Sequence, residues 1–329
     1  MLVRICLLTN QDIDSPDFPA DDWRCDPRPY LPEAEWTLGY IGDKETSIAD
    51  VEALVAQGFD LFFNLCDGCE SEEDNPGVEV VETLERLNQP YTGANPEFWE
   101  PTREKIKAVC RKMGIYTPKS VRVKDDASFE RAMKKLKFPM FVKHYSSYAS
   151  IDISRSSKVT TEAGLLRQVN KIIKKHGAAL VEEFIEGDEC TVLVAENPQD
   201  SDNPIAFTPI QYEFPAGDTF KHESLKWDEE QFTGLKTHPV TDPVLSARLR
   251  KESSELFRGL NGVGFGRCDI RIASDGTPYM LEINANCGIY YPDDAAGSAD
   301  FILACDPAGH VGFTQLLIDA AFARHNSRK

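Results

Sequence analysis

The stretch "GFGRCDIRIASDGTPYMLEINANCG", which runs from Gly264 to Gly288, contains two runs of alternating apolar and polar residues around Ser-Asp-Gly. Asp-Gly between two such runs is a strong signal for a β-hairpin. With Asp275 and Gly276 at the centre of the turn, three pairs lie opposite each other on one face: Asp269 with Glu282, Arg267 with Asn284, and Arg271 with Met280. The other face then points into a core, because side chains alternate along a strand, and it carries Cys268, Ile270, Ile272, Leu281 and Ile283.

Asp269 and Glu282 are facing carboxylates in this hairpin, with Cβ atoms about 5 Å apart. Two negative charges at that distance repel each other, so a cation is expected between them and removal of one charge should relieve the repulsion. Either an arginine such as Arg271 supplies the positive charge, or a divalent metal is held by Asp269, Glu282 and the amide oxygen of Asn284. Hard oxygen ligands of this kind suit Mg²⁺, which keeps several waters and binds substrate phosphates.

The composition is that of a large globular protein with no expected contact to nucleic acid or membrane. The chain has 329 residues, of which 41% are hydrophobic and 27% charged, and this predicts two or three domains. The net charge of −18 argues against a nucleic-acid partner. No apolar run approaches the roughly 18 residues of a membrane span. Nine cysteines, mostly inside apolar runs, indicate reduced thiols and a cytoplasmic location.

Alternating strands and helices are expected along most of the chain. The first hundred residues are typical of a parallel sheet covered on both faces, interrupted by the Pro- and Asp-rich segment Asp12–Trp36 as a long surface loop. A helix over Pro101–Ile115 opens a second unit, and strands dominate after the turn at Gly187. The predicted domains are therefore 1–101, 102–186 and 187–329.

Three further segments carry residues suited to binding a nucleotide. Lys143 ends an apolar strand and precedes a run of small hydroxylic residues, a pattern suited to cradling phosphate. The turn in "VEEFIEGDE" brings Glu182 and Glu189 close, and its backbone is placed to meet a flat heterocycle. Lys226, beside Trp227, is a candidate second phosphate lysine. Taken alone, each is more often a surface lysine or a solvated acidic turn.

In chain order, these segments resemble the ATP-grasp superfamily, and within it the D-alanine–D-alanine ligase-like branch. "GFGRCDIRIASDGTPYMLEINANCG" is similar to the family's metal-binding hairpin, "VEEFIEGDE" to its adenine-binding hinge, and "FPMFVKHYSSYASI" to its phosphate-binding loop. The resemblance covers nearly the whole chain from Asn64 to the end. It implies an α/β (α+β) fold of three domains, with an N-terminal parallel-sheet domain and with ATP held between two mixed sheets.

The resemblance also implies a role for each candidate residue. In the set that binds ATP, Lys105, Lys143 and Lys226 reach the phosphates, Glu182, Glu183, Phe184 and Ile185 read the adenine, Glu189 takes the ribose, and Trp227 packs near the base. The metal set, Asp269, Glu282 and Asn284, holds two Mg²⁺ ions, for which Mn²⁺ is a possible substitute. The catalytic set is Arg267, the Gly288 N–H, and Ser150 of the loop that covers the phosphates.

The implied activity is the ATP-dependent joining of a small-molecule carboxylate to an amine. A carboxylate is a poor electrophile, so ATP first converts it to an acyl phosphate, which the amine then attacks with release of phosphate. Three alternatives stay open: an ATP-grasp kinase, a thioester-forming enzyme and a non-catalytic ATP-binding module. The two substrates and the oligomeric state also stay open, a homodimer being possible.

The segments that depart from the family lie on the expected substrate walls. Where the D-alanine ligases carry a glycine-rich loop with an amino-group-binding Glu, this chain has "TNQDIDSPDFPADDW", and after the hairpin stands "IYYPDDAAGSAD". D-Alanine is therefore not assumed as the substrate. Three acidic segments, 12–22, 67–74 and 293–300, predict a cationic amine as the acceptor if they line the cleft; otherwise they are solvated loops of an acidic chain.

Overall fold

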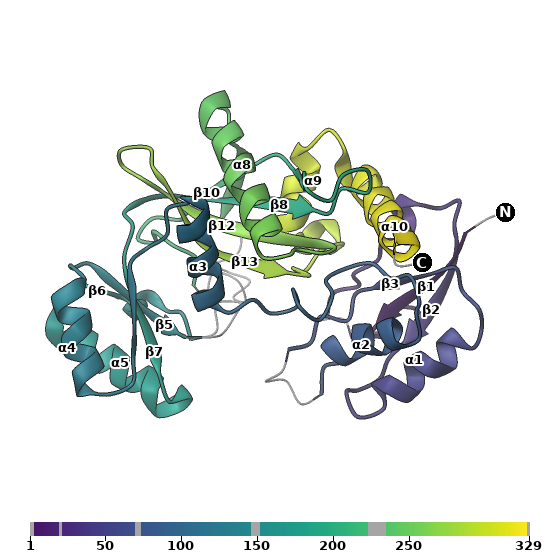
Figure 1. Ribbon diagram of the computed structural model, residues 1–329, viewed down its shortest axis with the longest axis horizontal. Coiled ribbons are helices and arrows are strands. Elements are labelled where there is room, and N and C mark those ends of the chain that lie inside the picture. The colour runs from purple at the N-terminus through teal and green to yellow at the C-terminus, as the bar shows by residue number, and fades with distance from the viewer. Residues whose placement is uncertain (1–2, 20–21, 70–73, 146–151, 223–234, 328–329) are drawn as a thin grey trace.

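The computed structural model describes residues 3–19, 22–69, 74–145, 152–222 and 235–327, and the strands of these residues form three sheets (Figure 1). The first sheet is parallel and has the order β2-β1-β3, with β1 Arg4–Thr9, β2 Glu35–Tyr40 and β3 Leu61–Asn64. The helices of this part of the chain are α1 Ser47–Val55 and α2 Val78–Arg86, and the 3₁₀ helix η1 Arg28–Tyr30 precedes β2. The predicted parallel sheet is confirmed.

The predicted loop Asp12–Trp36 is wrong at its end, because Glu35 and Trp36 already belong to β2. This strand lies at the edge of the sheet and alternates exposed with half-buried residues over most of its length. An edge strand with little burial has no apolar run, and the sequence therefore gave no signal for it.

The second sheet is antiparallel and has the order β4-β7-β5-β6. Its strands are β4 Ser120–Val123, β5 Met140–His144, β6 Lys158–Val159 and β7 Ala179–Glu183. Helices α4 Asp126–Lys135 and α5 Glu162–His176 share a hydrophobic core with it, and the 3₁₀ helix η2 Arg155–Ser157 precedes β6. Both helices begin at capping side chains, Asp125 and Thr161, each of which accepts a backbone N–H three residues on.

The third sheet is antiparallel, with the order β11-β10-β8-β12-β13 and with β9 paired to β8. Its strands are β8 Gly187–Ala195, β9 Ile205–Ala206, β10 Ile210–Glu213, β11 Lys236–Pro239, β12 Phe265–Ala273 and β13 Pro278–Ala285. The helices of this unit and of the end of the chain are α8 Pro243–Gly259, the 3₁₀ helix η3 Asp293–Ala295, α9 Ser298–Cys305 and α10 Gly309–Ser327.

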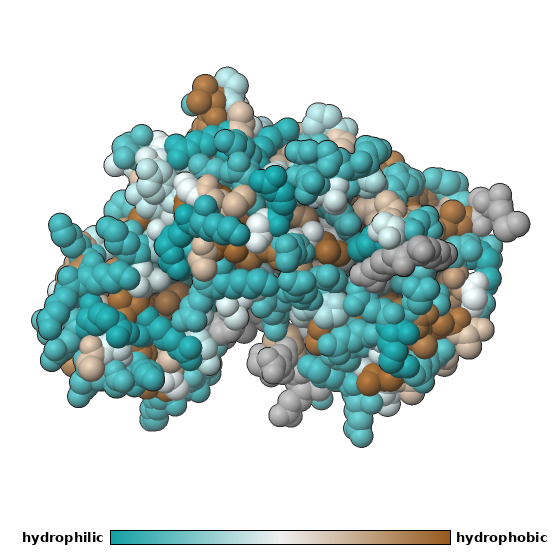
Figure 2. Space-filling view, in the orientation of Figure 1, coloured by the Kyte–Doolittle hydropathy of each residue, from teal (hydrophilic) through white to brown (hydrophobic). Residues whose placement is uncertain are grey.

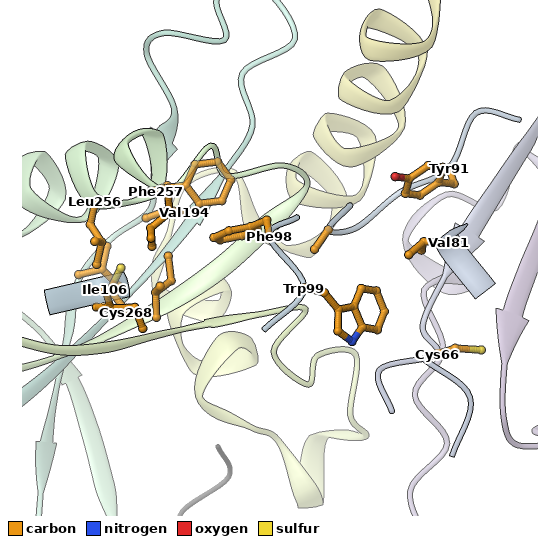
Figure 3. Close-up of a cluster of buried hydrophobic side chains, with 14 of the residues drawn as sticks. Cys66, Val81, Tyr91, Phe98, Trp99, Ile106, Val194, Leu256, Phe257 and Cys268 are labelled. Carbon is orange, nitrogen blue, oxygen red and sulfur yellow. The ribbon is translucent and has the colours of Figure 1, made fainter. Parts of the chain in front are cut away.

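Helix α3 Arg103–Met113 was expected to open the second unit, but it packs against α8 and β13 of the third. Its apolar side chains Ile106 and Cys110 are buried in the same cluster as Cys268 and Leu256 (Figure 3). The domain limits 102 and 186 describe chain order and stay a prediction, whereas the packing of α3 joins it to the sheet that carries the hairpin.

A continuous core joins the first and third sheets. In Figure 3, Phe98 and Trp99 lie between the side chains of the first unit and those around Phe257, and the Phe98 and Phe257 ring centroids are 5.0 Å apart. The indole N–H of Trp99 donates to the carbonyl of Gly68 at 3.2 Å. The connecting segment is therefore fixed to both units, and the third sheet is a rigid neighbour of the first.

The second sheet projects from this body as a separate lobe. Figure 2 shows that the visible surface is mostly hydrophilic and is hollowed between the lobe with β5–β7 and the lobe with β1–β3. Within the described ranges, no single helix is long and apolar enough to cross a membrane; α9 and α10 meet that criterion only as a pair, with a bend of 107° between them.

Candidate functional site

The β12–β13 hairpin has the predicted register at its far end. Arg267 pairs with Asn284 and Asp269 with Glu282, as expected. Arg271, however, pairs with Tyr279 and not with Met280. The loop holds three residues, since the N–H of Gly276 donates to the carbonyl of Ala273 and the N–H of Ala273 to the carbonyl of Thr277. This extra loop residue shifts the register by one, and a bulge beside Asp269 shifts it back.

The bulge exchanges the faces of two neighbouring residues. Met280 is fully buried in the core, whereas Leu281, predicted to point there, lines a cavity on the opposite face. The side chains of Asp269 and Glu282 point to that same cavity. Bulges re-aim side chains at functional sites, and this one returns both carboxylates to one face.

This first cavity lies between the second and third sheets and encloses about 730 Å³, including open solvent. The predicted residues that line it are Lys143, Glu182, Glu183, Phe184, Ile185, Glu189, Arg267, Asp269, Glu282 and Asn284. Residues that were not predicted complete the lining: Pro118, Phe141, Ile153, Phe220, Lys221, Arg271 and Leu281. Two sheets far apart in sequence thus bring most of the predicted set into one place.

Each facing carboxylate is paired with an arginine. Arg267 Nη2 donates to Asp269 Oδ2 at 3.1 Å, and Arg103 Nη2 donates to Glu282 Oε2 at 2.9 Å. Arg103 also donates to the carbonyl of His144, which fixes the first turn of α3 against β5. Arg267 and Arg103 thus supply positive charge beside the two carboxylates, and metal binding by these carboxylates stays a prediction. Arg271 instead pairs with Glu189 at 3.3 Å.

Asp269 and Glu282 stay ionised despite their burial. Burial alone would raise the pKa of both carboxyl groups, but the adjacent Arg267 lowers the pKa of Asp269 and Arg103 lowers that of Glu282, and the net shift is downward in both. Thr191 Oγ1 donates a further hydrogen bond to Asp269 Oδ1 at 2.8 Å. Both groups are thus permanent anions at neutral pH.

This donor set fits a hard divalent cation. Two ionised carboxylates face each other across β12 and β13, and Asn284 lies beside them, with its Nδ2 donating to Asp269 Oδ2 at 3.2 Å. If the Asn284 amide turned by half a rotation, its oxygen would face the Asp269 and Glu282 carboxylates. Among the described residues, no group of three or more His, Cys, Asp or Glu could hold a metal. The predicted set differs in including the amide oxygen of Asn284.

Glu182 is buried between two lysines. Its Oε1 lies 2.7 Å from Lys107 Nζ and its Oε2 lies 2.9 Å from Lys143 Nζ. Burial raises the pKa of Glu182, but Lys107 and Lys143 outweigh it and lower the pKa to about 2. Burial is also the main reason that the pKa of Lys143 is lowered, with Glu182 opposing it. The predicted adenine residue therefore also anchors the predicted phosphate lysine.

Lys221 is a buried cation that the sequence did not reveal. Its Nζ lies 3.7 Å from Asp269 Oδ1 and 3.8 Å from the centroid of the Tyr212 ring. Burial lowers its pKa, but Asp269 and neighbouring groups give a net increase, so it stays charged. Lys226, five residues later in an acidic run, is the second phosphate lysine that the sequence predicts, and this stays a prediction. Lys226, Trp227 and Ser150 lie outside the described residues.

Lys105 is exposed and is not among the residues that line the cavity. The buried cations of α3 are its neighbours Arg103 and Lys107, which are 4% and 3% exposed. A spacing of four residues places these two on one helix face, and this was the available signal. Cations at the start of α3 do reach the site, while a contact from Lys105 itself stays a prediction.

Aromatic side chains form the closed end of the cavity. Phe184 of the hinge and Phe141 have ring centroids 5.9 Å apart, and Phe220 packs edge-on against Phe141 at 5.0 Å. Ile153 belongs to the same small cluster. The hinge backbone is fixed by Glu183, whose N–H donates to the carbonyl of Lys119. These rings form an apolar wall beside the hinge backbone, and such a wall suits packing against a heterocyclic ring.

A second cavity, of about 720 Å³ including open solvent, begins where β13 ends. Asn286, Cys287 and Gly288 line it, whereas Asn284 lines the first. The Gly288 backbone is covered by Tyr291, whose hydroxyl oxygen would lie 2.3 Å from a Cβ at position 288. Any side chain there would displace this ring. Gly288 therefore lies in the second cavity, beyond the end of β13 and six residues after Glu282.

Comparisons with known proteins agree with this geometry. Residues 109–291 match the family model described as D-ala D-ala ligase C-terminus. D-alanine–D-alanine ligase B of Xanthomonas campestris pv. campestris is 30% identical over 244 residues, which are 72% of each chain.

Two solved structures share the fold over nearly the whole length. The D-alanine–D-alanine ligase of Bacillus anthracis complexed with ATP has a TM-score of 0.71 at 18% identity and covers 100% of both chains. The VanG D-Ala:D-Ser ligase of Enterococcus faecalis has a TM-score of 0.68 at 15% identity, covering 98% of this chain and 100% of its own. The predicted ATP-grasp fold is confirmed, and the chain belongs to the D-alanine–D-alanine ligase family.

Proposed function

We propose that this protein is an ATP-dependent carboxylate–amine ligase that forms an amide and releases ADP and phosphate. The observation that carries the proposal is that the chain lines the first cavity up to Asn284 and the second cavity from Asn286 onward. Asn284 lines the first cavity, Gly288 lines the second, and Arg267 lies in the first with its charge also acting on Cys287 of the second. A nucleotide in the first cavity would thus present its last phosphate to a substrate in the second.

In this proposal the first cavity binds ATP. The apolar wall formed by Phe141, Phe184 and Phe220 packs against the adenine, and the buried Glu189 accepts from the ribose. Lys143 and Lys221 neutralise phosphate oxygens, as fixed ammonium groups at the cavity wall do in phosphoryl-transfer sites. Among relatives of this fold, the Bacillus anthracis ligase is described as complexed with ATP.

Asp269, Glu282 and Asn284 would hold Mg²⁺. We propose that two Mg²⁺ ions bind here and that Mn²⁺ can substitute for them. The metal would supply positive charge against the phosphates during phosphoryl transfer. The residues of the chain position the reactants: Thr191 holds the Asp269 carboxylate by a hydrogen bond, and Arg103 holds that of Glu282. These contacts keep the oxygen donors oriented on rigid strands.

The carboxylate substrate attacks the γ-phosphorus and ADP leaves, which gives an acyl phosphate. The amine nitrogen then attacks the acyl carbon and forms the C–N bond. The bond from the acyl carbon to the phosphate oxygen breaks, phosphate leaves with its electron pair, and the amine proton passes to solvent. In this proposal, Arg267 and the Gly288 N–H donate to the oxyanion of the tetrahedral intermediate. A neutral amine needs little help from a general base, so this chemistry requires no Ser/His/Asp set.

The test is ADP and phosphate release with ATP, Mg²⁺ and pairwise pools of carboxylates and amines, followed by the mass of the product. D-Alanine with itself is the first pair, because the relatives are named for it. An amide has the summed mass of its parts less one water. A phosphorylated product without free phosphate would identify a kinase, and a product that requires a thiol would identify a thioester-forming enzyme. If the protein bound ATP but formed no ADP with any pool, the result would support a non-catalytic ATP-binding module.

A further inference from the structure

Asp152, which lies between β5 and β6, has an unusual backbone conformation. Its φ is 59°, in the left-handed region. Residues with a Cβ rarely adopt this region, and Asp and Asn are among those that tolerate it best. Such a conformation persists where the surrounding structure holds it. The contacts of the Asp152 side chain therefore decide the path of the chain at this point.

Two side chains in the last turn of α5 hold the Asp152 carboxylate. Lys175 Nζ donates to both carboxylate oxygens at 2.9 Å, and His176 Nε2 lies 2.6 Å from Oδ2. The Asp152 side chain is only 14% exposed. Burial raises the pKa of this carboxyl group, but the hydrogen bonds with Lys175 and His176 lower it more, and the net shift is downward. Asp152 is therefore an anion fixed to the end of α5.

These two side chains, and not the helix end itself, stabilise the carboxylate. The C-terminal end of a helix carries a partial negative charge, which disfavours an anion. His144, at the end of β5, lies beside the pair, with its ring centroid 4.1 Å from that of His176. Burial, with His176 and Arg103 adding to it, lowers the pKa of His144 to about 4, so His144 is neutral at pH 7. Lys175 and His176 thus provide the contacts that fix Asp152.

The residue after Asp152 belongs to the apolar wall of the first cavity. Ile153 is 9% exposed, lines this cavity and packs with Phe184 and Phe220. Asp152 is not among the described residues that line the cavity. Because the two residues are adjacent, the backbone angles of Asp152 set the direction in which the Ile153 side chain leaves the chain. The contacts with α5 therefore reach the nucleotide site through Ile153.

Resting on the proposed function, we infer that Asp152 is a positioning residue for ATP: its contacts with Lys175 and His176 hold Ile153 in the wall against which the adenine packs. Asp152 acts through Ile153 and does not itself contact the nucleotide. It acts on the affinity for ATP and not on the chemical step, because the phosphate lysines and the metal-binding carboxylates lie on other segments.

Calorimetry with ATP and Mg²⁺ tests this inference without the carboxylate or amine substrate. Asp152→Asn keeps the shape of the side chain and its tolerance of the left-handed region but removes the charge, and it should weaken ATP binding roughly 5- to 10-fold. Asp152→Gly removes the backbone strain together with the carboxylate and should weaken ATP binding at least as much. Lys174→Gln, at an exposed side chain in the same turn of α5, is the matched control and should leave the affinity unchanged.

Two further variants separate positioning from a merely structural role. Lys175→Gln changes a side chain that is 62% exposed, so it should weaken ATP binding with little effect on thermal stability. Ile153→Ala should weaken ATP binding by itself, and in this background Asp152→Asn should add little, because the side chain through which it acts is gone. With the substrates of the ligation, Asp152→Asn should raise the KM for ATP and change kcat by less than about 2-fold.

Three outcomes would overturn the inference. One is a full further loss of ATP affinity when Asp152→Asn is added to Ile153→Ala. Another is wild-type affinity in Asp152→Gly, which would mean that the backbone conformation alone places Ile153. The third is wild-type affinity in Asp152→Asn; the inference then fails while ATP binding and the proposed function stand. Absence of ATP binding in the wild type would instead overturn the proposed function and the inference together.

Discussion

Glu182 couples the stability of the fold to pH. Its pKa is lowered to about 2 because Lys107 and Lys143 outweigh the effect of burial. A carboxyl group whose pKa is lower in the folded state stabilises the fold above its unfolded pKa of about 4.3, and this contribution is lost as pH falls from there toward 2. The glutamate of the predicted adenine hinge is therefore also a structural group.

We expect Glu182→Gln to reduce the free energy of unfolding by about 3–5 kcal/mol at pH 7, because two lysines remain buried without their anion. The stability of the Glu182→Gln variant should also fall less steeply between pH 5 and pH 3 than that of the wild type. Urea unfolding at several pH values measures both effects. Glu130→Gln is a suitable control, since Glu130 is 72% exposed and pairs only with Lys134 at 3.6 Å. Equal acid dependence in Glu182→Gln and the wild type would contradict the assignment.

Asp269→Asn and Glu282→Gln should each abolish ADP formation and also destabilise the protein. The bare hairpin suggested that removing one charge relieves repulsion, but each carboxylate is paired with a buried arginine. Loss of the anion leaves that arginine uncompensated, and such a change costs about 3–5 kcal/mol in a buried pair. Thermal unfolding without Mg²⁺ measures this. An unchanged or higher melting temperature would mean that repulsion dominates.

Lys143→Ala should weaken ATP binding more than it lowers stability. Lys143 Nζ is buried at the cavity wall, and Glu182 keeps its second partner, Lys107, when Lys143 is removed. Calorimetry with ATP and Mg²⁺ gives the affinity, and urea unfolding gives the stability. Lys105→Ala serves as the comparison, because the resemblance assigns it a phosphate contact while the structure places it in solvent. Unchanged ATP affinity in Lys143→Ala would remove Lys143 from the site.

At the scale of elements, the hairpin shows how far alternation predicts side-chain direction. The pair Asp269 and Glu282 was correct, since the three-residue loop and the bulge offset each other at that point. Between the loop and the bulge every pair is displaced by one, and Leu281 and Met280 exchange faces. Sequence alone gives the period of two but not the insertion of one residue, because a bulge depends on the strands packed beside it.

This exchange predicts different effects for two adjacent truncations. Met280→Ala should lower the free energy of unfolding by about 2–5 kcal/mol, as for other fully buried side chains. Leu281→Ala should cost clearly less stability but should weaken ATP binding, because Leu281 lines the first cavity. Urea unfolding and ATP calorimetry on both variants separate the two roles. A larger stability loss in Leu281→Ala than in Met280→Ala would instead support the prediction from simple alternation, in which Leu281 points into the core.

The site cations show a second limit of sequence reasoning. Lys143 was found because it ends an apolar strand, and this signal is local. Arg103, Lys107 and Lys221 were missed, because their burial arises from elements brought together by folding. A lysine or arginine on a helix or loop is indistinguishable from a solvated one until its tertiary partner is known. Local patterns thus predicted the strand-borne residues, and tertiary contacts decided the others.

At the scale of the whole molecule, an ion pair joins the lobe of the second sheet to the body across the first cavity. Arg155 Nε donates to Asp218 Oδ1 at 2.7 Å and its Nη2 donates to Asp218 Oδ2 at 2.8 Å. Nearby Ile153 and Phe220 come from the same two segments and meet in the aromatic cluster of the cavity. The bidentate pair and the small apolar contact therefore add to the contacts of Arg103 with His144 and of Lys107 with Glu182 in holding the lobe.

We expect Arg155→Gln to raise the KM for ATP with little effect on thermal stability, because Arg155 is 59% exposed and the substitution removes its pair with Asp218 between the lobes. Hydrogen exchange should become faster at the hinge around Phe184. Lys134→Gln, which breaks an exposed pair within one helix, is the control and should change neither quantity. Unchanged exchange at the hinge in Arg155→Gln would show that the other contacts hold the lobe without this ion pair.

Helix α10, the last helix, packs on the first sheet, and this has a consequence for synthesis of the chain. Phe63 of β3 shares a core with Phe313 of α10, whose position in the chain is 250 residues later. At 5–20 residues per second, a ribosome needs roughly 10–50 s to span that distance. During this time the apolar face of β1 and β3 lacks its cover. We therefore expect the first unit to expose this apolar face until α10 has been synthesised, and to bind chaperones during that interval.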